Sequence, residues 1–446
     1  MIFANGDPFA LAKQDACTLT QLLRIAPIVA PNDDVSVVFQ MKFIKPELGD
    51  DGDITRFSEN ILCFNDGDKR KTIPEWNGAW RFRLDGDADD GFDPLQFRGN
   101  ADMNGSAELI DFIQWAKKYS PAEKYILIIK KHGPDVPELE RLDAFDKLTS
   151  DFYTDERLNL FSLDPSRQAR AAYETDEALD RSVTFAVEFS FPERLNVLAF
   201  DSCSRAFIEN AFALRNSADM LIASEDDITI ESRWHYDDWI PALVLHPAMS
   251  ANQLGDLIRE RYVDRYAEDK AATSATLSVT DLHLVGSLAS RFDHLVDLFQ
   301  SISVEPQLLQ LRPKPYALSN VDFMTFLYNL SRRQAVTTTP AQMQAQRQFR
   351  SSYANLASDF SYAVKAFAGP TAIALHGSLG LTIYFPTCTD PKMLMFIGDA
   401  YNPDRSDALP MVRAHPKWAC VLRRLLAQQC NQPIPTSVQC NTGPIH

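Results

Sequence analysis

The chain has 446 residues, of which 45% are hydrophobic and 23% are charged, and its formal net charge at pH 7 is -16. This is the composition of an ordinary globular protein that is long enough for two domains. The acidic balance excludes nucleic acid and anionic membrane surfaces as partners bound through overall charge, and we interpret it mainly as solubility. No apolar run reaches the roughly 18 to 20 residues that a bilayer span needs.

The cysteines give no sign of a disulfide framework. There are seven of them, with no CxxC pair, so the pattern also lacks a zinc site and favours a reducing compartment. The N-terminal stretch MIFANGDP lacks the basic and long apolar regions of a leader. We therefore expect a cytoplasmic protein, although MIFAN reads as the end of a strand, which leaves open a lost leader or first half-strand.

The first part of the chain alternates strands and helices. We predict a strand over 1–5, an amphipathic helix over 14–26 and a strand over 34–43, which is the pattern of a βαβ unit. Residues 45–104 are rich in loops and acidic residues, with hairpin strands over 56–64 and 80–85 that decorate the core.

From residue 106 the periodic signals are stronger. Leu109, Phe112, Ile113 and Ala116 lie on one face of a predicted helix over 106–119, which a serine opens. The following strand, over 124–133, is too apolar to be half exposed, as in a parallel strand covered on both faces. Further strands are predicted over 184–189, 195–203 and 219–226, with a helix over 204–217.

The rest of the first 300 residues continues this order. Helices are predicted over 236–247 and 251–268, and a short strand leads into a long helix over 275–302. The repeated alternation predicts an α/β fold with a doubly wound, mostly parallel sheet over residues 1–300. Helices over 317–334 and 338–369, with a strand over 376–386, predict a smaller and mainly helical domain over 301–446, whose tail frays.

Two of the central strands end on residues that suggest catalysis. His132 and Gly133 end one strand and Cys203 ends another, at the sheet edge where ligands bind in such folds. A cysteine directly before a helix has its thiolate favoured by the helix dipole, and a nearby imidazole can act as acid and base in acyl transfer. The N–H groups of Gly133 and Cys203 could form an oxyanion hole worth about 3 kcal/mol per donor. The alternative is that Cys203 is a small buried hydrophobe.

The segments around these residues resemble the clostripain-like cysteine peptidases of family C11, in the clan of caspases, legumain and gingipains. The resemblance lies in YILIIKKHG, LAFDSC and MNGSAELIDFIQWAKKYSPAEKY, and further in ADMLIASEDDITIESRWHY, GLTIYFP and HPKWACVLRRLL, so it spans Met1 to about Ala427. It implies a caspase-like α/β sandwich with a mostly parallel central sheet and a helical C-terminal part. It also implies that His132 is the general acid and base, that Cys203 is the nucleophile and that Gly133 lies in the oxyanion hole.

The resemblance further implies cleavage after Arg or Lys, with an acidic pocket for the basic side chain. Asp201 matches the aspartate of the family and is the first candidate for that pocket, since a buried carboxylate pairs with a guanidinium or ammonium group. The alternative is that Asp201 caps the following helix. Ser224, Glu225 and Asp227 close the next strand and are further substrate-binding candidates, unless they form a solvated acidic loop.

The chain departs from the family pattern at several positions. Lys131 precedes the histidine where the family usually has an acidic residue, and Ser204 and Arg205 replace small apolar residues after the cysteine. Arg205 could lower the thiol pKa or neutralise the acidic pocket. These changes motivate an alternative function, a catalytically inactive relative that binds a peptide or protein in the cleft.

The resemblance also implies activation by self-cleavage between the His and Cys strands, for which we expect one of four basic residues: Lys147, Arg157, Arg167 or Arg170. No cofactor is expected, although the resemblance allows calcium. The acidic run over 84–93 could attract a cation, but a solvated turn is the commoner reason for such a run. No GxGxxG or GxxxxGK[ST] motif follows a strand, which disfavours nucleotide binding. The expected partner is a polypeptide with Arg or Lys at the cleavage site, and the oligomeric state is not predicted.

Overall fold

The structure is a computed structural model of the chain. It describes these residues: 1–4, 11–29, 31–43, 78–84, 92–103, 106–130, 183–226, 228, 234–267, 273–301, 308–316, 320–332, 339–387, 400–406, 408–430 and 440. All statements below concern these residues.

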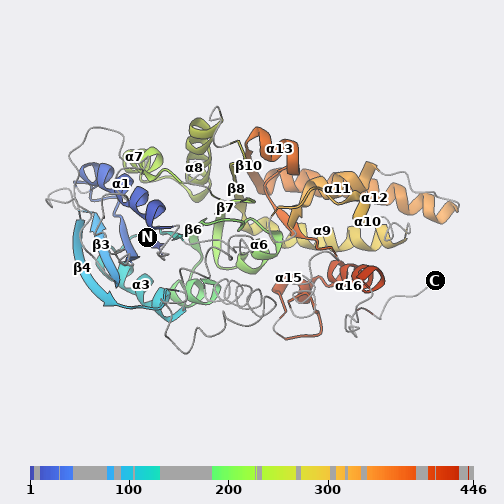
Figure 1. Cartoon of the computed structure of the whole chain (residues 1–446), viewed down its shortest axis with the longest axis horizontal. Helices are drawn as coiled ribbons and strands as arrows, with labels where there is room; N and C mark the ends of the chain where they lie inside the picture. Colours follow the sequence, from blue (N-terminus) through green and yellow to red (C-terminus); the bar gives the residue numbers. More distant parts are fainter. Residues whose placement is uncertain are drawn as a thin grey trace, which may run out of the picture.

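A nine-stranded mixed sheet forms the centre of the molecule, in the order β10-β8-β7-β6-β5-β1-β2-β3-β4 (Figure 1). The strands are β1 (Ile2–Ala4), β2 (Val38–Phe43), β3 (Gly78–Leu84), β4 (Phe92–Gly99), β5 (Ile126–Lys130), β6 (Leu195–Asp201), β7 (Ala218–Ala223), β8 (Thr276–Asp281) and β10 (Val364–Ala368). The run from β7 through β6, β5 and β1 to β2 is parallel, whereas β8, β10, β3 and β4 are antiparallel to their neighbours. The predicted α/β class with a parallel centre is confirmed.

Helices cover both faces of the sheet. They are α1 (Leu11–Val29), α3 (Ser106–Tyr119), α6 (Ile208–Leu214), α7 (Tyr236–Leu245), α8 (Ala251–Tyr266), α9 (Leu282–Ser301), α10 (Leu308–Leu311), α11 (Phe323–Arg332), α12 (Pro340–Ala363), α13 (Pro370–His376), α15 (Pro410–Ala414) and α16 (Lys417–Cys430). In the view of Figure 1, α1, α7 and α8 lie above the sheet and α3 and α6 lie below it. One hydrophobic core therefore lies on each face, as expected for strands that are apolar on both sides.

The predicted helix over 106–119 is confirmed as α3, and its predicted apolar face is the buried one. The segment over 184–189 is an error of prediction, because residues 183–190 are helical. Its β-branched and aromatic residues suggested a strand. Val183, Ala186 and Val187 are nevertheless buried while Phe185 and Phe189 are exposed, which is the spacing of a helix with one buried face.

The region predicted to decorate the core instead extends the sheet. The predicted strand over 80–85 is part of β3, which pairs with β2 and with β4, whereas the segment over 56–64 lies outside the described residues. Sequence analysis did not find β4. The two strands are joined to α3 by a polar network centred on Arg81.

The C-terminal part also contributes to the central sheet. The predicted helix over 338–369 ends at Ala363, and the chain continues directly as β10, which pairs antiparallel with β8. A separate two-stranded sheet joins β9 (Asn320–Asp322) to β11 (Thr382–Tyr384). The domain boundary at residue 300 stays a prediction. The central sheet contains strands from both sides of this boundary, because β10 pairs with β8.

A disulfide joins Cys420 of α16 to Cys440 in the C-terminal tail, a pairing that sequence analysis did not predict. Reduction of this bond is expected to lower the free energy of unfolding of the tail and α16 by about 3 kcal/mol, because the bond closes a loop of 20 residues. Denaturant unfolding with and without a phosphine reductant measures the effect, and Cys440→Ser is the control that should respond less to reductant than the wild type. An unfolding midpoint that reductant leaves unchanged would contradict the prediction.

Among the helices that the structure describes, none is both long and apolar enough to cross a membrane.

Candidate active site

The candidate site is built on the carboxyl ends of β5 and β6. These neighbouring parallel strands end at Lys130 and Asp201, which are Cα partners in the sheet. Cys203 follows Asp201 by two residues, and His132 follows Lys130 by two residues. His132 and Gly133 lie outside the described residues, so their predicted roles stay predictions.

A tight turn carries Cys203 (residues 203–206), and backbone hydrogen bonds fasten it to the loop after β7. The N–H of Ser204 donates to the Asp226 carbonyl (3.1 Å), and the N–H groups of Arg205 and Ala206 both donate to the Ser224 carbonyl (2.9 Å each). Ser204 has a φ of 48°, a left-handed conformation that is uncommon for a residue with a side chain. Strain of this kind persists where the surroundings hold the backbone firmly, as these bonds do here.

The thiol of Cys203 is half-buried and is not part of a disulfide. The backbone N–H of Ile228 donates a hydrogen bond to its sulfur at 3.2 Å. A donor aimed at the sulfur favours the thiolate over the thiol. Nothing in the sequence marks Ile228 for this role, because any residue at that position supplies the same backbone group.

The predicted helix over 204–217 begins later than expected. Its observed counterpart, α6, starts at Ile208 and has seven residues, so Cys203 does not lie directly before a helix. The argument that a helix dipole favours the thiolate is therefore wrong. The N-cap position of α6 is Phe207, with no side-chain cap, so the alternative in which Asp201 caps this helix is also wrong.

Asp201 is buried and makes its contacts within the protein. Its Oδ2 accepts hydrogen bonds from Lys130 Nζ at 2.9 Å and from the Tyr236 hydroxyl at 2.8 Å. The side chains of Lys130 and Asp201 are 3% and 1% exposed. A basic substrate residue would have to compete with Lys130 for this carboxylate. The pairing of Lys130 with Asp201 was not predicted from the sequence. A lysine at the end of one apolar strand and an aspartate at the end of the next could have indicated it.

Ser224 and Glu225 also lie inside the protein. The Ser224 hydroxyl hydrogen-bonds to the Thr276 hydroxyl at 2.7 Å, and a Glu225 carboxylate oxygen accepts from the N–H of Gly380 at 2.9 Å. Burial and the nearby charge of Asp322 raise the pKa of Glu225 well above its ordinary value. Both residues support the loop that holds the turn of Cys203. Their predicted contact with substrate is untested, and Asp227 lies outside the described residues.

Another His-Gly pair in the sequence, His376 and Gly377, has a different setting. His376 is the last residue of α13, and Gly377 is its left-handed C-cap with a φ of 73°. The imidazole stacks on the ring of Tyr316, with centroids 4.2 Å apart. These contacts give His376 and Gly377 a structural role at the end of α13.

The described part of the chain contains no group of three or more His, Cys, Asp or Glu side chains that could hold a metal ion. We therefore assign no residues to calcium.

Comparison with known proteins agrees with this geometry. The model of the clostripain family, Peptidase_C11, matches residues 59–339, which is more than half of the chain. No curated protein sequence matches the chain.

Three solved structures share the fold over most of the chain. An inactive zymogen C11 protease from Parabacteroides distasonis has 16% identity and a TM-score of 0.53, over 93% of this chain and 96% of that one. A secreted C11 cysteine protease from Bacteroides thetaiotaomicron, called iotapain, has 13% identity and a TM-score of 0.52, over 86% and 92%. A structure of a secreted C11 cysteine protease from the same organism, bound to an irreversible peptide inhibitor, has 14% identity and a TM-score of 0.53, over 93% and 97%. The family model and the shared fold together place this chain in the clostripain family, C11, of cysteine peptidases.

Proposed function

We propose that the protein is a cysteine endopeptidase in which Cys203 is the nucleophile and His132 is the general acid and base. One observation carries the proposal: Lys130 and Asp201 are register partners at the ends of β5 and β6. His132 and Cys203 each stand two residues further along these strands. Cys203 packs against the same core as the neighbouring β6 residues Val197 and Ala199, and the carboxyl ends of adjacent parallel strands meet at one edge of the sheet, which supports a shared crevice for the imidazole and the thiol.

The chemistry follows from these two groups. The thiolate attacks the carbonyl carbon of the peptide, and the imidazolium donates its proton to the leaving amine, which leaves an acyl-enzyme. Water, deprotonated by the imidazole, then attacks the acyl carbon and releases the carboxylate product and the thiol. The Ile228 N–H that donates to the sulfur supports the thiolate form before attack.

Specificity for Arg or Lys is the finer part of the proposal. Among the acidic side chains near Cys203, Asp201 and Glu225 are buried, while Asp226 is half-buried. Asp226 also belongs to the loop that fastens the turn of Cys203. We therefore favour Asp226 and the neighbouring Asp227 as the carboxylates that bind the basic side chain of the substrate through charge-assisted hydrogen bonds.

Hydrolysis of fluorogenic peptides tests the function. The wild type is expected to cleave peptides with Arg or Lys before the scissile bond faster than matched peptides with norleucine there. Cys203→Ala and His132→Ala should each lower kcat by about 10⁴-fold or more. An arginyl acyloxymethyl ketone should label the wild type on Cys203, as mapped by mass spectrometry.

The matched control is Cys430→Ala, which replaces another cysteine of the chain and should keep full activity. The inactive peptide-binding relative is the competing function, and it would give the same background signal for the wild type and Cys203→Ala. That result would refute the peptidase proposal. The same comparison, made by mass spectrometry of the purified chains, tests self-cleavage after Lys147, Arg157, Arg167 or Arg170, which all lie outside the described residues.

The disulfide favours an oxidising compartment over the cytoplasm that we expected from the sequence. Disulfides such as Cys420–Cys440 persist mainly in oxidising compartments. The Bacteroides proteins of the same fold are described as secreted. We therefore propose an oxidising compartment for this protein.

A further inference from the structure

The ion pair of Lys130 and Asp201 lies at the ends of β5 and β6, and Asp201 stands two residues before Cys203. It joins the last residues of β5 and β6, and the Tyr236 hydroxyl of α7 donates to the same oxygen, Oδ2, that Lys130 contacts. Nothing among the described residues donates to the other oxygen, Oδ1. Both donors therefore contact Oδ2, and Lys130 is the cation that compensates the negative charge of Asp201.

Asp201 and Cys203 lie on the same side of the sheet. Val197 and Ala199 of β6 belong to the core under α1, α7 and α8, and alternation places Asp201 on that face, where it contacts Tyr236. Cys203 packs partly against the same core. A carboxylate at this position, if left uncompensated, would disfavour a second negative charge on the sulfur two residues away.

We propose that Lys130 and Asp201 are positioning residues for Cys203: the pair fixes the ends of β5 and β6 in register, and Lys130 cancels the charge of Asp201 so that the carboxylate does not suppress the thiolate. The inference deepens the proposed function, because it concerns the same thiol. It assigns Asp201 to the protein's own Lys130 rather than to the basic side chain of a substrate.

Among the described residues, the other charged and titratable side chains near Cys203 come from three elements. Arg205 belongs to the turn itself, Glu225 and Asp226 belong to the loop after β7, and Tyr236 comes from α7. The variants below leave all of these unchanged. A difference between variants therefore reports on Lys130 and Asp201.

The test measures the rate at which iodoacetamide alkylates Cys203 as a function of pH, with the site resolved by mass spectrometry. Lys130→Gln keeps a donor for Asp201 but removes the charge, and should move the midpoint of the rate profile up by about one pH unit. Asp201→Asn should move it down. Lys130→Gln/Asp201→Asn, which removes both charges, should return it close to the wild-type value.

The matched control is Lys130→Arg, which keeps the charge and should keep the wild-type midpoint. Equal midpoints in Lys130→Gln and Lys130→Arg would overturn the inference. If one of Lys130→Gln and Asp201→Asn does not fold, as judged by circular dichroism, the other decides: the inference requires its midpoint to move in the stated direction, and an unchanged midpoint overturns it.

Peptide hydrolysis separates this role from substrate binding. At pH 7 Lys130→Gln should lower kcat several-fold and leave KM unchanged, for Arg and norleucine peptides alike. If Asp201→Asn instead raises KM for Arg peptides alone, Asp201 is a substrate residue and the inference fails. Alkylation needs no peptidase activity, so a wild type that cleaves no peptide would refute the proposed function and leave the alkylation result to decide the inference.

Discussion

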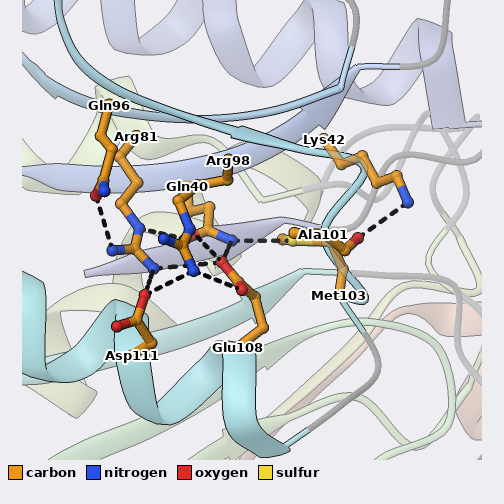
Figure 2. Close-up of polar contacts among 9 residues, drawn as sticks. All are labelled: Gln40, Lys42, Arg81, Gln96, Arg98, Ala101, Met103, Glu108 and Asp111. Atoms are coloured by element: carbon orange, nitrogen blue, oxygen red, sulfur yellow. Dashed lines mark hydrogen bonds and ion pairs between the residues drawn. The ribbon is translucent and has the colours of Figure 1, made fainter.

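Replacement of Arg81 by methionine is expected to lower the free energy of unfolding by about 3 to 5 kcal/mol. The guanidinium of Arg81 is the centre of a polar network between β3, β4 and α3 (Figure 2). Its side chain is 1% exposed, and it donates to Asp111 at 2.6 Å and to Glu108 at 3.3 Å. Methionine would fill similar volume but would leave the partly buried carboxylate of Glu108 without one of its cations.

The amides of the network make the loss of Arg81 more costly. Arg81 Nε donates to Gln40 at 2.6 Å, and another guanidinium nitrogen donates to Gln96 at 3.0 Å. The guanidinium also lies over the ring of Trp115, 5.3 Å from its centroid. Buried acceptors that lose their donor cost about 1 to 3 kcal/mol each, so several small penalties add to the unpaired charge.

Arg98→Met is the matched control for this prediction. Arg98 pairs with the same Glu108 through two hydrogen bonds of 3.0 Å, but its side chain is 26% exposed. Water can replace these bonds, so its loss should cost only about 1 kcal/mol. Urea unfolding followed by fluorescence measures both variants. Equal and small losses in Arg81→Met and Arg98→Met would contradict a buried, structure-determining role for Arg81.

The second large effect is a loss of stability as the pH rises, caused by the buried carboxyl pair of Glu225 and Asp322. Both carboxyls are buried, and each has a raised pKa in the folded protein. Burial raises the pKa of Asp322 from 3.8 to about 6. The pKa of Glu225 is raised well above its ordinary value. Burial is the main cause, followed by the charge of Asp322, with a smaller contribution from Asp226.

The sign follows from proton binding. Both pKa values are higher in the folded protein than in the unfolded chain, so the folded state binds more protons and its stability falls as pH rises. The stabilisation is complete below about pH 4 and is lost as pH passes through 6. For Asp322 alone, the change from 3.8 to about 6 corresponds to about 3 kcal/mol. The elements affected are the loop after β7 and the segment around Gly380, which Glu225 joins.

Glu225→Gln removes the proton-dependent part of this interaction. The glutamine amide can donate to Asp322 at every pH, while its oxygen still accepts from the Gly380 N–H. Between pH 5 and pH 8 the wild type should therefore lose more stability than Glu225→Gln, because only the wild type has the raised pKa of Glu225. Glu260→Gln, at a side chain that is 65% exposed, is the control and should follow the wild type. Parallel stability curves for the wild type and Glu225→Gln would show that Glu225 binds no extra proton in the folded protein.

Strong local periodicity explains which elements could be predicted. The helix α3 was found together with its buried face, because its apolar residues repeat with helical spacing and a serine opens it. The strands β5 and β6 were found because parallel strands covered on both faces are continuously apolar. The helix over 183–190 was missed, because a short run rich in β-branched and aromatic residues has the local signal of a strand, and only packing decides against it.

The sequence by itself determined the α/β class and the two strand ends where a histidine and a cysteine follow buried strands, because hydrophobic pattern and residue order are local properties. Only the tertiary structure decided that β10 and β4 join the central sheet and that Lys130 forms an ion pair with Asp201. It also decided that the Ile228 N–H and the loop after β7 hold Cys203 in place. The physical reason is that these contacts join residues far apart in the chain, and their partners are selected by burial, register and charge compensation, which no local pattern encodes.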